Sequence, residues 1–279
     1  MTPKEYLDRY TYLAIASPFD GTRISCGLTG YGSGWNFRNG KGGGGATVQK
    51  EYFLFREALR KAHHGNANTP CGPKFYFADK PLAQIKPSED FYAESLVRAY
   101  VGKGSPDEIS DALRLAMALG RVGTDRDVNG RSPAKPTVQQ YAKDFMTLDC
   151  NCLVGNFYGA DPDAHISVYA SPGRRRTRIS EVQPGDAIVT HCKEAPYEHV
   201  GLIADWVPST GSSVRVKIAE WGWYGGEEMH YRESTQTITQ GPISTLGIGW
   251  ASKSNAKHGV TSFRYIFAPQ TSNAPWGWS

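Results

Sequence analysis

Two short stretches decide the fold that the sequence predicts: residues 147–154, which are Thr-Leu-Asp-Cys-Asn-Cys-Leu-Val, and residues 198–203, which are Glu-His-Val-Gly-Leu-Ile. The first places Cys150 where a helix is predicted to begin, and the second places His199 on an apolar run typical of a buried strand. The positive end of a helix dipole stabilises a thiolate, and a histidine on a neighbouring strand can take the thiol proton. In this order, the two stretches predict a Cys–His nucleophile.

Glu220 is the candidate third member of this group. It ends a predicted strand over residues 213–220 and has the same parity as the apolar positions of that strand, so its carboxylate is predicted to face the core. Those positions are Val214, Val216 and Ile218. A buried carboxylate needs a partner, which the His199 imidazole would supply. Asp205 is the alternative partner, although it lies near a turn on the same predicted strand as His199.

Working outward, the pattern places helices before strands. Helices are predicted over residues 48–63, after a capping box at Ser105, and from Thr137. Strands are predicted over residues 75–77, 166–169, 187–189, 200–204, 213–220 and 263–267, and the Gly-rich residues 20–46 are predicted to be a loop. This order predicts an α+β fold with an antiparallel sheet.

Composition restricts the class of protein. A hydrophobic content of 39% with 21% charged residues is typical of a globular chain. The net charge of +4 suits an anionic polymer such as cell wall and is too small to indicate nucleic acid. The 5 cysteines are odd in number and irregularly spaced, which argues against a disulfide framework and for a reducing compartment. Because the glycine run lacks the Lys-Ser or Lys-Thr pair of a phosphate-binding loop, we predict no cofactor.

The N-terminal residues carry no basic segment followed by an apolar core, and no apolar run approaches the length of a membrane span. The sequence therefore predicts no secretory signal peptide and no membrane span. We expect a protein that is cytoplasmic as synthesised. If its substrate lies outside the cytoplasm, a dedicated secretion system or cell lysis would have to release it.

The two deciding stretches resemble a known family. Residues 149–154 resemble the Asp-Cys-Ser-Gly-(aromatic or aliphatic)-Val motif of the NlpC-type cell-wall cysteine peptidases, and Pro184-Gly185-Asp186 followed by His199 resembles the Pro-Gly-Asp turn and histidine strand of that family. The resemblance covers about residues 136–221 and implies a papain-like fold with Cys150 as nucleophile and His199 as base. Glu220 then takes the third position, which is acidic in the related CHAP amidases. We accordingly expect an N-terminal accessory region at residues 1–100 and a papain-like catalytic domain at residues 101–279.

The resemblance also implies a reaction and substrate contacts. Asp149 matches a position that helps to hold the free amine of a peptide substrate, Asn151 replaces the family serine, and Trp221 is a candidate wall of the substrate groove. We expect hydrolysis of an amide bond in peptidoglycan stem peptides, with an immunity or inhibitor protein as a candidate partner. Two alternatives are a transferase or deamidase acting on an intracellular protein, and a non-catalytic wall-binding or structural module.

Other patterns at these residues have simpler explanations. A zinc site would use Cys150, Cys152, His191 and Cys192, but their spacing does not match the paired ligands of structural zinc sites. Cys152 either packs beneath the helix or acts as a redox brake on Cys150. The basic run at residues 174–178 is either a solvated edge or a contact for an anionic polymer.

Overall fold

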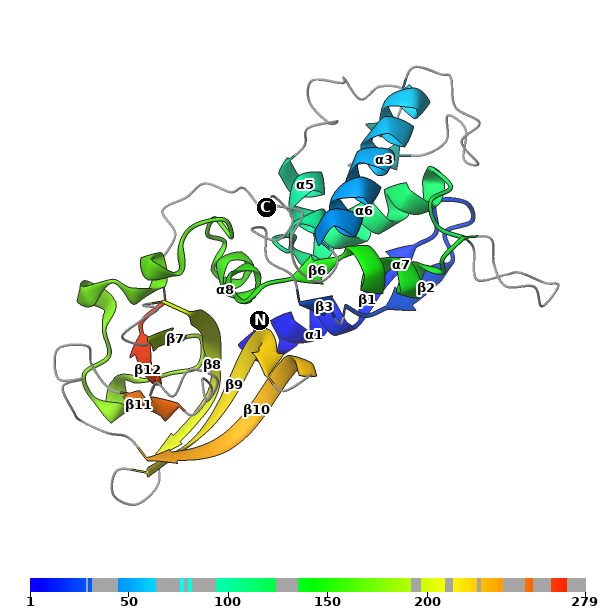
Figure 1. The fold of residues 1–279 in the computed structure, drawn as a ribbon. Helices are drawn as coiled ribbons and strands as arrows, with labels where there is room; N and C mark the ends of the chain where they lie inside the picture. The colour runs from blue at the N-terminus through cyan, green and yellow to red at the C-terminus, as the bar shows by residue number, and fades with distance from the viewer. Residues whose placement is uncertain are drawn as a thin grey trace. The chain divides into compact units, whose positions relative to one another are not determined.

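The structure is a computed structural model, shown in Figure 1. It describes residues 1–28, 30–31, 45–63, 76–77, 80–81, 94–123, 135–191, 197–208, 213–224, 227–237, 249–252 and 262–269. The chain forms two compact units, one of residues Arg9–Asp149 and the other of Met1–Asp8 with Cys150–Ser279. Helix α1 (Pro3–Thr11) crosses the border between them.

The first unit is mainly helical. Its helices are α3 (Gly45–His63), α5 (Glu94–Tyr100), α6 (Pro106–Ala118) and α7 (Val138–Phe145). Its strands form three pairs, which are β1 (Leu13–Ala16) with β2 (Arg23–Cys26), β3 (Gly30–Tyr31) with β6 (Thr147–Leu148), and β4 (Tyr76–Phe77) with β5 (Lys80–Pro81). Helix α6 packs against β1 and α7 packs against β2, so both helices belong to this unit. The division into an accessory region at residues 1–100 and a catalytic domain at residues 101–279 stays a prediction. The predicted loop at residues 20–46 is wrong at β2, whose alternating Ile24 and Cys26 pair with β1.

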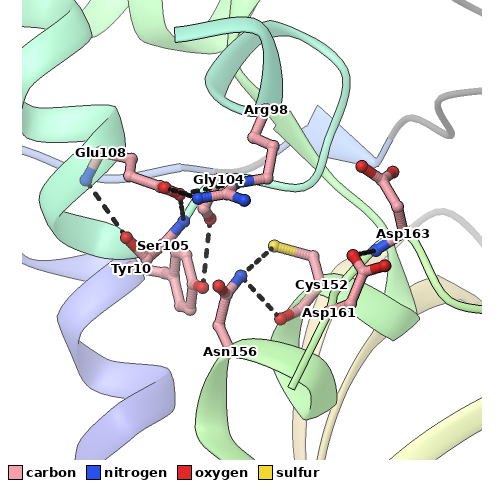
Figure 2. Close-up of polar contacts among 9 residues, drawn as sticks. All are labelled: Tyr10, Arg98, Gly104, Ser105, Glu108, Cys152, Asn156, Asp161 and Asp163. Atoms are coloured by element: carbon pink, nitrogen blue, oxygen red, sulfur yellow. Dashed lines mark hydrogen bonds and ion pairs between the residues drawn. The ribbon is translucent and has the colours of Figure 1, made fainter. Parts of the chain in front are cut away.

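The start of α6 follows the sequence prediction closely. The Ser105 hydroxyl accepts the Glu108 backbone N–H at 3.2 Å, and the Glu108 carboxylate accepts the Ser105 N–H at 2.8 Å, which completes the capping box shown in Figure 2. Pro106 fills the first helical position, where a missing N–H costs nothing. The Arg98 guanidinium pairs with the same carboxylate, so this local signal also joins α5 to α6.

The second unit holds the predicted antiparallel sheet. The strands are β7 (Ala187–His191), β8 (His199–Pro208), β9 (Ser213–Tyr224), β10 (Glu227–Thr237), β11 (Gly249–Ser252) and β12 (Ser262–Phe267). They lie in the order β10-β9-β8-β7-β12-β11, with every neighbouring pair antiparallel. Helix α8 (Cys150–Tyr158) packs against β8 and β9 (Figure 1). The α+β class is therefore confirmed.

One predicted strand is a helix instead. Residues 166–169 belong to the 3₁₀ helix η3 (Ile166–Ala170), which is followed by η4 (Pro172–Arg174) and η5 (Ile179–Glu181). The His165 ring caps η3, because its Nδ1 accepts the Ser167 backbone N–H at 3.2 Å. This local cap outweighs the alternating pattern that had indicated a strand.

The Pro-Gly-Asp turn positions the first strand of the sheet. Gly185 has φ +94°, a conformation that glycine adopts without strain. Its backbone N–H donates to the Ile203 carbonyl on β8, and the Ile203 N–H donates to the Asp186 carbonyl. The Asp186 carboxylate is fully buried and accepts two guanidinium hydrogen bonds from Arg176, at 2.9 and 2.7 Å. One arginine of the basic run therefore anchors the turn, and Arg174 similarly donates to the Val168 carbonyl.

One face of this sheet carries both an apolar cluster and the candidate site. The cluster consists of Val182, Ile188, Ile203, Trp206, Val214, Val216, Ile218 and Ile266. The register pairs Thr190 with His199 on one side and with Arg264 on the other, so these three side chains share a face. They have the same parity as Ile188, Ile203 and Ile266 of the cluster, and the polar group therefore adjoins the apolar core.

Across the described ranges of the chain, no helix is both long enough and apolar enough to cross a membrane.

Candidate functional site

Helix α8 begins at Cys150, as the sequence predicts. The Cys150 side chain is buried, with 5% of its residue surface exposed, and it is a free thiol. The Asn151 side-chain amide donates to the Ala164 carbonyl and ties the start of α8 to the segment before η3. The Asn151 Oδ1 accepts no hydrogen bond from the described residues.

His199, the first residue of β8, lies beside Glu220 in the second half of β9, which continues to Tyr224. The imidazole Nε2 is 3.1 Å from Glu220 Oε2, and the two residues are 8% and 0% exposed. An ionised Glu220 would accept a hydrogen bond from an Nε2–H, and this tautomer would leave the basic lone pair of the neutral ring on Nδ1. The expected contact between Glu220 and His199 is therefore present, and the buried position of Glu220 is confirmed.

Asp205, the alternative partner, lies elsewhere. Its side chain is 42% exposed and is 3.9 Å from the Lys217 ammonium, while its Oδ1 accepts the Trp206 backbone N–H. The surface position explains why this carboxylate needs no buried imidazole.

Arg264 is a member of the site that the sequence prediction missed. Its guanidinium nitrogen is 3.1 Å from Glu220 Oε2, the same oxygen that His199 contacts, and the residue is only 5% exposed. A signal was present in the sequence, because an arginine inside the apolar strand Phe263–Phe267 must find a buried anion or leave the core. The structure thus gives a His199–Glu220–Arg264 cluster on three strands of one sheet.

The thiol is not bonded to this cluster. Cys150 lies in the same unit, on the helix that packs against β8 and β9, but within the described ranges no hydrogen bond joins its sulfur to His199. The structure therefore brings together two of the three predicted catalytic side chains.

Because Gly201 has no side chain, Glu220 can pack directly against the backbone of β8 at this position. A Cβ at position 201 would lie 2.9 Å from the Glu220 Cβ and 3.2 Å from the Ala219 carbonyl oxygen. Contacts this close force the neighbouring strand to move, since both atoms belong to or adjoin the backbone of β9.

We expect Gly201→Ala to destabilise the protein by about 1–3 kcal/mol, the usual cost of overpacking, and to weaken the His199–Glu220 contact. Urea unfolding measures the first effect. Gly173→Ala is the matched control, because a Cβ at position 173 would meet no atom within 4 Å. Equal stability of the two variants would show that β8 and β9 tolerate a side chain at position 201.

Asp149 has a cationic partner inside its own unit. Its carboxylate lies 2.7 Å from the Lys103 ammonium, with both side chains about nine-tenths buried, and its backbone N–H donates to Gly102. A substrate amine would therefore have to compete with Lys103 for the role that the family resemblance assigns to Asp149.

Burial corrects the expectation for Trp221 and distinguishes the two alternatives for Cys152. Trp221 is completely buried, so it packs in the core and does not wall an exposed groove. Cys152 is also completely buried, and the Asn156 side-chain amide lies 3.0 Å from its carbonyl oxygen and 3.3 Å from its sulfur (Figure 2). Side chains two residues apart on a helix do not face each other, so the structure favours packing over a redox brake for Cys152.

One member of the alternative zinc set, Cys192, lies outside the described residues. In the described part of the chain, no group of three or more His, Cys, Asp or Glu side chains is arranged to hold a metal ion. The His191 ring instead contacts the rings of Tyr197 and Tyr265 edge-on, at centroid distances of 5.8 and 6.1 Å.

Comparisons of the chain with protein-family models, with curated proteins and with solved structures find no match.

Proposed function

We propose that this protein is a papain-like cysteine hydrolase of the NlpC type that cleaves an amide bond, with peptidoglycan stem peptides as the substrate class. The buried hydrogen bond between His199 and Glu220 is the observation that carries the proposal, because a carboxylate that fixes an imidazole is the support that a Cys–His nucleophile requires. The thiol at the first residue of α8, a helix that packs against the histidine strand, supports it further.

The proposed reaction has two steps. Nδ1 of His199 accepts the thiol proton, the Cys150 thiolate attacks the carbonyl carbon, and the imidazolium then protonates the leaving amine to give a thioester. In the second step His199 takes a proton from water, the hydroxide attacks the thioester, and the released thiolate is reprotonated. The Cys150 backbone N–H at the helix start would donate to the oxyanion.

The absence of a thiol–imidazole hydrogen bond is compatible with this reaction. Catalytic hydrogen bonds are often long without substrate and shorten in the substrate complex. The Lys103–Asp149 ion pair also bears on the substrate, since it disfavours recognition of a free amine by Asp149. An internal amide bond is therefore the preferred target. We further propose that such a hydrolase is exported by a dedicated system or released by lysis. We also propose that it has a matching immunity or inhibitor protein.

Digestion of purified peptidoglycan, with the soluble products identified by mass, tests the proposal. We expect new amine and carboxylate termini in the stem peptides. Intact peptidoglycan together with fast, selective labelling of Cys150 by iodoacetamide at mildly acidic pH would instead favour a transferase or deamidase. Slow labelling equal to that of denatured thiols would favour a non-catalytic module.

A further inference from the structure

One carboxylate oxygen of Glu220 contacts both His199 and Arg264. Its Oε2 is 3.1 Å from the His199 Nε2 and 3.1 Å from a guanidinium nitrogen of Arg264, and the same nitrogen is 3.5 Å from Oε1. All three side chains are at least nine-tenths buried. The charges in this group therefore have to balance within the protein rather than through water.

We propose that Arg264 is a positioning residue of this site, which holds Glu220 as a carboxylate and thereby keeps His199 a neutral base. With Arg264 present, the guanidinium and the carboxylate already cancel each other, and no proton is needed on His199. The inference rests on the proposed function for its catalytic meaning, but its electrostatic content can be measured without activity.

The effect of removing Arg264 on the site follows from the relative basicity of histidine and glutamate. A buried carboxylate without its guanidinium must acquire a proton nearby, and the ordinary pKa of a histidine, about 6.5, exceeds that of a glutamate, about 4.3. The proton would therefore settle on His199. The site would then hold an imidazolium, whose Nδ1 can no longer accept the thiol proton.

The other elements around the histidine add little charge. Helix α8, which packs on β8, contains no acidic or basic side chain, and its titratable groups are Cys150, Cys152 and Tyr158. On β7, Thr190 lies opposite His199, and His191 has the opposite parity. On β10, His230 occupies the register position opposite Glu220. Among the side chains that the structure describes, Glu220 and Arg264 are therefore the charged groups that we infer to set the protonation of His199.

Titration of the His199 imidazole by NMR in the full chain tests the inference. The resonance is assigned with His199→Gln and separated from His230 with His230→Gln. In the parent protein we expect a midpoint within about one pH unit of the ordinary histidine value. A midpoint more than about two pH units above that value would overturn the proposal, because a histidine bonded to an unneutralised carboxylate titrates high.

Substitutions of Arg264 separate the effect of its charge on His199 from the effect of its side-chain packing. We expect Arg264→Met, which keeps the length of the side chain, to raise the His199 midpoint by about one pH unit or more, and Arg264→Lys to restore the parent value. Thr190→Val is the matched control, because Thr190 lies between Arg264 and His199, is 2% exposed, and has a hydroxyl without a hydrogen bond among the described residues. An equal shift in the Met and Lys variants, or none in Met, would contradict the inference.

The outcomes also separate this inference from the proposed function. If Arg264→Met does not fold, Arg264→Gln and the titration of the parent still decide the question. If the parent shows the expected midpoint but cleaves no amide, the proposed function fails while the electrostatic role of Arg264 stands. If the parent cleaves stem peptides and its His199 titrates high, the function stands and the role of Arg264 is withdrawn.

Discussion

Cys150→Ala is expected to abolish amide hydrolysis, with a fall in turnover of at least about 10⁴-fold, as for the loss of a nucleophile in other hydrolases. The fold should survive, because alanine is a good helix former and position 150 loses only a small buried group at the start of α8. The measurement is the release of new termini from peptidoglycan, with urea unfolding of the same samples.

Cys152→Ala is the matched control for the nucleophile. It removes a thiol two residues away on the same helix, one that packs in the core and lies near the Asn156 side chain. We expect it to lose stability and to keep its activity per folded molecule. Full activity in the Cys150→Ala protein would remove the proposed mechanism, and unfolding of that protein alone would favour a structural role for the thiol.

Local signals explain what the sequence predicts well. The capping box at Ser105, the start of α8 and the alternation through β9 each depend on neighbours within a few residues, so the sequence contains them completely. The orientation of Glu220 is such a case, since strand parity alone places it on the face of Val214 and Val216.

Long-range contacts explain what the sequence does not reveal. The Glu220 partner Arg264 is 44 residues further along the chain, and only the strand order β9-β8-β7-β12 brings the two together. Likewise, the pairing of Lys103 with Asp149 depends on how residues 102–103 meet the end of the first unit. Helices α6 and α7 likewise join the first unit by packing on β1 and β2, which are far from them in the sequence.

Substitution of Glu220 is expected to have the second large effect on turnover, and two different variants separate its effect on the reaction from its effect on stability. Glu220→Gln keeps the size of the side chain and can still accept the His199 N–H, but it no longer stabilises the imidazolium that forms during the reaction. We expect turnover to fall by about ten- to a thousand-fold with little change in substrate affinity, less than for Cys150, because an orienting group contributes less than a nucleophile.

Glu220→Ala should add a structural cost to the catalytic one. It leaves the Arg264 guanidinium buried beside His199 without its carboxylate, and breaking a buried ion pair in this way typically costs about 3–5 kcal/mol. Steady-state kinetics and urea unfolding of both variants measure the two effects. Asp205→Asn is the control, because this carboxylate is 42% exposed and lies beside Lys217. Crippled kinetics in Asp205→Asn with unchanged kinetics in Glu220→Gln would show that the buried carboxylate does not orient the base.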